Sequence, residues 1–130
     1  MAISRTLLES TLKSSVCEIK WVRRIPRTDY ALSRRALATN SRLLLNTKRG
    51  ASVFKYASPT QPNVLDTARL NLVTYYDLMR LEYRNVSCES AVLIKVFPLT
   101  DEKTLDKWWA TFNRFIKGMS GDQKKQFMDS

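Results

Sequence analysis

The clearest pattern along the chain is a run of apolar residues spaced three and four apart after Pro98. This spacing predicts an amphipathic helix with one face turned to a core. Thr100 is a suitable N-cap, and Asp101 and Glu102 suit the positive end of the helix dipole. The apolar stripe consists of Leu105, Trp108, Trp109, Phe112, Phe115 and Ile116.

The helical pattern changes at its C-terminal end. Lys117 favours a helix terminus, and Gly118 suits the left-handed position that often follows one. Residues 120–128 predict a second short helix, with Ser120 as its cap. The chain therefore ends in two predicted helices.

Two segments before Pro98 have the composition of strands. Residues 16–24 are rich in β-branched and aromatic types, which favour strands. Residues 91–97, Ala-Val-Leu-Ile-Lys-Val-Phe, are the clearer strand. Strict alternation predicts one face made of Val92, Ile94 and Val96, and another made of Ala91, Leu93, Lys95 and Phe97.

The middle of the chain is less regular. We predict a weak strand within 30–48, a hairpin turn at 48–50 and a returning strand at 52–56, followed by a loop at 58–63. Over 65–83 the helical spacing of apolar residues conflicts with a content of β-formers, so strand and helix both remain open.

Composition indicates a single globular domain over residues 1–130 with an unusual charge. The chain has 22 Lys and Arg against 12 Asp and Glu, a net charge of +10. Residues 1–57 hold twelve basic and three acidic residues, whereas residues 58–130 hold ten and nine. A positive surface attracts polyanions such as nucleic acids. We therefore expect RNA as a partner, bound mainly by the first half of the chain.

The residue inventory argues against several other classes. The chain has no histidine, which excludes Ser-His-Asp and Cys-His nucleophile arrangements. Two cysteines, Cys17 and Cys88, make neither a disulfide framework nor a convincing metal site. Three scattered glycines do not form a phosphate-binding loop. We expect no enzyme, no cofactor, no metal, no small-molecule substrate and no membrane span.

The basic residues on or near predicted strands are the candidate RNA-binding groups, because Lys and Arg neutralise phosphates and neighbouring aromatics can stack on unpaired bases. The set comprises Lys20, Arg34, Arg35, Arg42, Lys48, Arg49, Lys55 and Lys95.

Three of these features together resemble the coat proteins of single-stranded RNA bacteriophages of the levivirus type. Residues 51–56 are similar to a charged strand of that family, which ends in a proline-bearing turn, here 58–60. Residues 91–98 are similar to its last strand, and residues 99–102 to its abrupt switch from that strand to a long helix.

The resemblance implies an α+β fold, with an N-terminal β-hairpin (within 1–24), a five-stranded antiparallel sheet (within 30–97) and two C-terminal helices (within 100–128). It also implies an interlocked homodimer, in which each subunit lays its helices over the partner's sheet and the other sheet face meets genomic RNA. Such dimers assemble into the shell of a virion inside the host cytoplasm. Contacts between shell subunits would come from the loop at 84–90, with Asn85, Ser87 and Cys88.

Two other functions remain open. An Arg-rich, acid-poor N-terminal half is also typical of an organellar import sequence. The chain would then be a basic subunit of an organellar ribosome or a similar ribonucleoprotein, losing about its first 45 residues. A more distant alternative is an all-helical adaptor, with 65–83 packed on 101–117.

Overall fold

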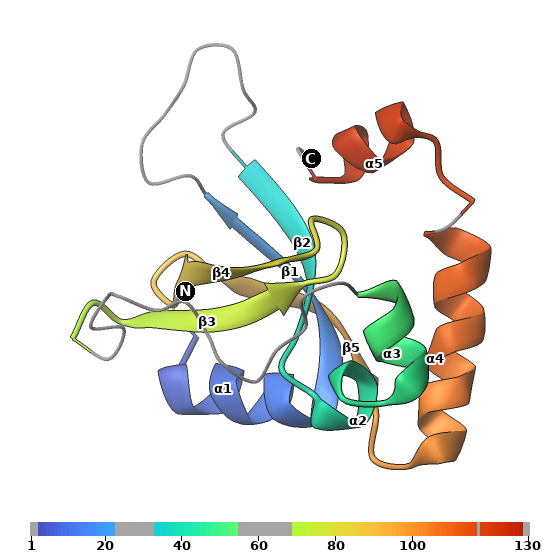
Figure 1. The fold of residues 1–130 in the computed structure, drawn as a ribbon. Coiled ribbons are helices and arrows are strands. Elements are labelled where there is room, and N and C mark those ends of the chain that lie inside the picture. Colours follow the sequence, from blue (N-terminus) through green and yellow to red (C-terminus); the bar gives the residue numbers. More distant parts are fainter. Residues whose placement is uncertain (1–2, 23–32, 55–68, 117, 129–130) are drawn as a thin grey trace.

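The computed structural model describes residues 3–22, 33–54, 69–116 and 118–128. Its architecture is α+β, with a five-stranded antiparallel sheet and helices on both sides (Figure 1). The elements are α1 (Arg5–Ser14), β1 (Ser15–Val22), β2 (Ser33–Thr39), α2 (Arg42–Leu45), α3 (Lys48–Val53), β3 (Leu72–Asp77), β4 (Glu82–Ser87), β5 (Val92–Pro98), α4 (Glu102–Phe115) and α5 (Gly121–Met128).

The N-terminal hairpin is confirmed, but it begins later than the range within 1–24 that the resemblance implied. Residues 5–14 form α1, which starts at the capping hydroxyl of Ser4 and buries Leu8 and Leu12. The hairpin is made by β1 and β2, which pair antiparallel from Val16↔Thr39 to Val22↔Ser33. Helical spacing of Leu8 and Leu12 is the local reason that the first segment is a helix.

The middle of the chain differs from its predicted hairpin. Residues 48–53 form α3 and not a turn with a returning strand, so the likeness of 51–56 to a coat-protein strand is wrong over 51–53. Thr47 caps this helix by accepting a hydrogen bond from the Gly50 N–H at 3.1 Å. A short-range cap of this kind outweighs the modest strand propensity of a six-residue segment. The predicted loop at 58–63 lies outside the described residues.

The ambiguous segment 65–83 resolves into strands over its described part. β3 and β4 form a hairpin in register from Leu72↔Ser87 to Asp77↔Glu82. The buried carboxylate of Asp77 holds the intervening turn, accepting from the N–H groups of Met79 and Arg80 and from the Arg80 guanidinium at 2.7 Å. The all-helical alternative is therefore wrong.

The sheet is strongly curved. Its strand order is β4-β3-β2-β1-β5, so β4 and β5 are the two edges. In a flat sheet those edges would lie about 19 Å apart, at roughly 4.8 Å per strand spacing. However, residues 88–91 join them in a tight turn, in which the Ala91 N–H donates to the Ser87 carbonyl at 3.1 Å. The end of β4 and the start of β5 are therefore close neighbours.

A β-bulge changes which side chains of β5 share a face. β1 pairs Glu18 with Lys95 but Ile19 with Leu93, which leaves Ile94 as the extra residue. Leu93 consequently packs with Ile19 on the side of α1, while Phe97 packs on the side of α4. The strand prediction for 91–97 is confirmed, but the prediction of strict alternation is wrong at this point.

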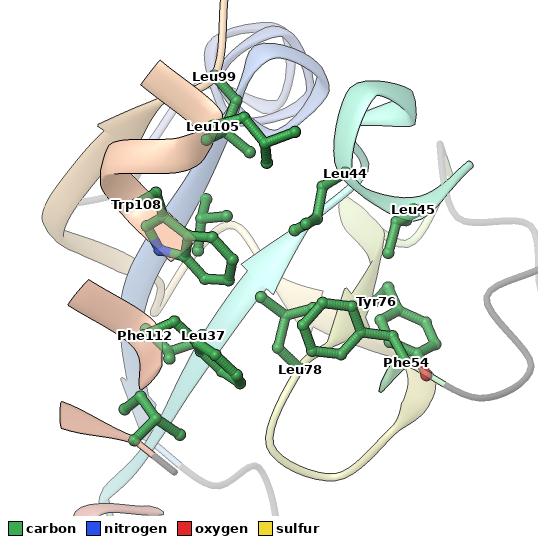
Figure 2. Close-up of a cluster of buried hydrophobic side chains, with 12 residues drawn as sticks. Leu37, Leu44, Leu45, Phe54, Tyr76, Leu78, Leu99, Leu105, Trp108 and Phe112 are labelled. Atoms are coloured by element: carbon green, nitrogen blue, oxygen red, sulfur yellow. The ribbon is translucent and has the colours of Figure 1, made fainter. Parts of the chain in front are cut away.

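Each face of the sheet carries a separate hydrophobic core. The α1-side core lies inside the curve and is closed by α1; its buried members are Leu8, Leu12, Cys17, Ile19, Ala36, Ala38, Val73, Tyr75, Val86, Cys88 and Ala91. The α4-side core lies on the other face, beneath α2, α3 and α4. Figure 2 shows Trp108 and Phe112 directed from α4 toward Leu37 of β2 in this second core.

The two C-terminal helices are confirmed, with differences at their ends. α4 is capped by Asp101 rather than Thr100, through a capping box in which the Thr104 N–H donates to Asp101 at 2.8 Å. The C-cap of α4 is Ile116, so Gly118 is not the residue directly after the cap, where it was predicted. Ser120 does cap α5, since the Gln123 N–H donates to its hydroxyl at 3.2 Å.

Candidate nucleic-acid interface

The basic residues of β1, β2 and β5 are divided between the two faces of the sheet. Lys20 pairs with Arg35, and both lie on the α4 and α5 side by the alternation of the strands. The Arg35 guanidinium stacks over Phe127 of α5 at 5.0 Å and lies 3.8 Å from the Glu18 carboxylate. Arg34 pairs with Trp21 and alternates to the α1 side.

A cavity of about 370 Å³ lies between the sheet, α4 and α5. Lys95 and Arg114 line it together with Glu18, and most of its other lining residues are apolar side chains of the α4-side core. The charges here are mixed and include an acid. This face is covered by helices, whereas the resemblance implied that RNA meets the sheet face away from them.

The remaining described candidates lie on α2 and α3. Arg42 is the first residue of α2 and is exposed, as is Lys48 at the start of α3. Arg49 faces α4, where its Nη1 donates to Asp106 at 2.5 Å and its guanidinium lies 5.4 Å from the Trp109 ring centre. Lys55 lies outside the described residues. The candidates do not gather into one surface.

A second cavity, here called the cationic cavity, lies where the C-terminal end of α1 meets α2. Its volume is about 620 Å³. Its lining residues are Lys13, Ser14, Asn40, Ser41, Arg42, Leu43, Leu45, Asn46, Tyr83, Leu99 and Thr100. It brings Arg42 together with Lys13, a residue that the sequence did not single out. The apolar spacing of Leu8 and Leu12 was the signal for the helix that positions Lys13.

The electrostatics of the cationic cavity are one-sided, since no carboxylate is among its lining residues. Lys13 and Arg42 form no ion pair with any other residue that the structure describes, unlike Arg5, Arg35, Arg49, Arg80 and Arg84. Burial raises the pKa of Tyr83, and the nearby Arg42 cation opposes that rise. Arg42 therefore lies near Tyr83, and both residues line the cavity.

The predicted inter-subunit loop at 84–90 is mostly strand. Asn85 and Ser87 belong to β4, and the Thr74 hydroxyl contacts the Asn85 side chain at 2.5 Å. Cys88 is fully buried in the α1-side core and is not an exposed loop thiol. The reason is the curvature of the sheet, which folds the connection from β4 to β5 inward. Only the exposed Glu89 and the half-buried Ser90 remain as a turn reaching solvent.

The aromatic stripe of α4 is buried within this chain. Leu105, Trp108, Phe112 and Ile116 are each no more than 5% exposed, and Trp109 is half-buried against them. The side chain of Phe115 lies outside the described residues. The stripe is thus covered by the chain's own β1 and β2 together with α2 and α3, and needs no partner for this purpose.

The outer edge strand β5 carries three exposed apolar side chains, which the bulge distributes over both faces of the sheet. Val92 is 50%, Ile94 48% and Val96 40% exposed. Among the described residues no strand pairs with this edge, since β5 is hydrogen-bonded only to β1. Exposed edge strands with apolar side chains are templates for pairing with another chain.

Both cysteine thiols are free and buried. Burial raises the pKa of Cys17 to about 12, and burial is also the main cause that raises the pKa of Cys88. Both are therefore neutral thiols at physiological pH, which makes them poor nucleophiles and poor metal ligands.

The described residues contain no group of acidic or thiol side chains arranged to hold a metal ion. None of the helices in the described ranges has the length and apolar character needed to cross a membrane. In the comparisons with known proteins, no protein-family model, curated protein or solved structure matches this chain.

Proposed function

We propose that this chain is a structural protein that self-assembles through the open edge of β5 and packages single-stranded RNA, in the manner of a levivirus-type coat protein. The observation that carries the proposal is the exposed apolar edge of Val92, Ile94 and Val96 in a chain of net charge +10. The edge provides a self-complementary contact, and the charge provides attraction for a polyanion.

The occupant of the β5 edge is a second copy of the chain. Two β5 strands related by a two-fold axis can pair antiparallel, because an isologous contact brings the same patch of both subunits together. The bulge at Ile94 places Val92 and Val96 on opposite faces of the sheet, since Val92 pairs with Lys20 and Val96 with Cys17. The backbone groups of the two open edges therefore make the contact, and an apolar side chain lies beside it on each face. The resemblance implied a dimer in which each subunit's helices cover the partner's sheet. In this structure α4 is already covered within its own chain, so the proposed dimer contact is the β5 edge instead.

RNA is the partner that the charge favours. Cations bound to RNA phosphates release counterions, so affinity depends steeply on salt and little on base sequence. The excess of basic over acidic residues in the first half of the chain suits this general kind of binding. No small molecule, cofactor or membrane is required by the proposal.

The position of the N-terminal segment favours this function over that of an imported ribosomal subunit. β1 lies between β2 and β5, and Val16, Cys17 and Ile19 are fully buried. Loss of about 45 residues would remove α1, β1 and β2 and would open both cores. We therefore expect the N-terminal segment to remain in the working protein.

The test is to express the chain, add single-stranded RNA and image the product by electron microscopy. The expected result is closed, uniform particles that contain RNA, and dissociated material that sediments as two chains. A stable monomer that forms no particles with RNA would contradict the coat-protein proposal.

A further inference from the structure

We propose that the cationic cavity, where Lys13 of α1 and Arg42 of α2 meet, binds a backbone phosphate of single-stranded RNA. This inference rests on the proposed function for the identity of the polyanion. It adds a specific site to what is otherwise a general attraction by charge, and it assigns a role to Lys13.

The first argument is the charge of the site. Two cations line one cavity with no lining carboxylate, and neither forms an ion pair within the described structure. Five arginines elsewhere in the described ranges each have an acidic partner, whereas no carboxylate lies against these two cations in the cavity. A pair of cations left unneutralised in one hollow favours an anion from outside.

The second argument is the shape and remaining chemistry of the cavity. A volume of about 620 Å³ lies within the range of small-ligand sites, so a nucleotide unit is of suitable size. Hydroxyl and carboxamide groups of Ser14, Asn46 and Thr100 line it with the cations. Leu43 and Leu45 supply an apolar wall, against which the flat face of a base can pack.

The third argument is that the positions of the two cations are set by the fold. The α1 end is fixed to the sheet, since the Asn40 N–H donates to the Leu12 carbonyl at 2.9 Å and the Leu99 N–H to the Ser14 carbonyl at 2.8 Å. α2 follows β2 directly, and the Ser41 N–H donates to Thr39 Oγ1 at 3.0 Å. These bonds hold the backbones of both elements, so the site does not have to be assembled by RNA.

The test compares two double variants that change net charge equally. One carries Lys13→Gln and Arg42→Gln, and the control carries Lys103→Gln and Lys107→Gln on the exposed face of α4. Binding of a labelled short oligouridylate is measured by anisotropy across a salt series. Thermal melting checks that each variant is folded, and Arg42→Lys is a charge-conserving variant.

The expected result is a log–log salt dependence that is shallower by about 0.7 for each cavity cation removed. Affinity at low salt should also fall roughly tenfold per cation, as loss of a charged hydrogen bond predicts. The control and Arg42→Lys should stay close to the unaltered protein. An equal loss of RNA affinity in both double variants, or no loss in the cavity variant, would overturn the assignment of the phosphate site to the cationic cavity.

The source of the phosphate is tested separately with inorganic phosphate at matched ionic strength. Weak displacement of the oligouridylate supports an RNA site, whereas complete displacement at low phosphate concentration would overturn it in favour of a free anion. A cavity variant that binds RNA normally and still forms particles would refute only the proposal that the cationic cavity binds an RNA phosphate. An unaltered protein that neither binds RNA nor assembles would refute the proposed function as well.

Discussion

Arg49 of α3 donates a hydrogen bond to Asp106 of α4 at 2.5 Å, and this contact joins two helices separated by more than fifty residues in sequence. The same guanidinium lies over the ring of Trp109. Arg49 was a candidate RNA-binding residue because of its charge. In the folded chain its charge is engaged in fixing α3 against α4, beside the Phe54 ring that packs edge-on to Trp109.

The Arg49–Asp106 pair is expected to stabilise the protein only slightly. Both side chains are about half exposed, at 45% and 59%, and solvent screens such pairs. A double-mutant cycle with Arg49→Gln and Asp106→Asn should give a coupling of about 0.2–1 kcal/mol in urea unfolding. Arg49→Gln should also change the salt dependence of RNA binding less than Arg42→Gln does. If Arg49→Gln changed the salt dependence of RNA binding more than Arg42→Gln does, this would mean that RNA breaks the Arg49–Asp106 pair.

Gly50 is expected to be the glycine at which an added methyl group is most harmful. A Cβ there would lie 1.8 Å from the Leu44 carbonyl oxygen, so α2 and α3 would have to move apart. Gly50→Ala should lower the free energy of unfolding by roughly 1–3 kcal/mol, the usual cost of overpacking. Urea unfolding measures the change.

Gly121 provides the matched control for that substitution. No neighbouring atom lies within 4 Å of its would-be Cβ, and it begins a helix. Gly121→Ala should be neutral or stabilising by up to about 1 kcal/mol. Equal destabilisation at both glycines would show that the corner between α2 and α3 is not closely packed.

The β5 edge provides a direct test of self-association. Ile94→Lys places a charge at the centre of the exposed edge, and charges on edge strands oppose pairing. The variant should remain folded but sediment as a single chain, because Ile94 is 48% exposed and contributes little to either core. Leu7→Lys on α1, where Leu7 is 54% exposed, is the control and should still dimerise. A dimeric Ile94→Lys protein would place the subunit contact elsewhere.

The buried thiol of Cys17 predicts a loss of stability at alkaline pH. Burial raises its pKa from 9.0 to about 12, so the folded state retains a proton that the unfolded state releases. This contribution is fully present below about pH 9 and is lost as the pH rises toward 12. Tyr76, whose pKa burial raises from 10.0 to about 12, adds to the loss in the upper part of the same range.

Denaturant unfolding from pH 8 to 11 measures this dependence, and Cys17→Ala should flatten its first part. The same burial predicts that neither thiol reacts with a thiol reagent at pH 8 until the protein unfolds. Assembled particles should therefore run mainly as single chains in non-reducing electrophoresis. Linked pentamers or hexamers would show that Cys88 leaves the α1-side core during assembly.

The sequence by itself determined the features that depend on neighbouring residues. The strand-forming residues of 91–97, the apolar stripe after Pro98 and Ser120 before the last helix identified β5, α4 and α5, because propensity, periodicity and capping act over a few residues. The α+β class was implied by the resemblance to the coat-protein family, and the structure confirms it. In the same way, the spacing of Leu8 and Leu12 contains the signal for α1, although the resemblance to the coat-protein family placed the hairpin over that segment.

Only the tertiary structure decided the features that depend on distant segments. Ile94 becomes a bulge because of the register between β1 and β5, and this register separates Leu93 from Phe97. Cys88 is buried because the curved sheet brings β4 next to β5. Arg49 has an acidic partner because folding places Asp106 of α4 beside it. Arg42 instead lines a cavity in which no carboxylate is a lining residue. Charge and propensity are properties of single residues, whereas pairing and burial require the partner that folding supplies.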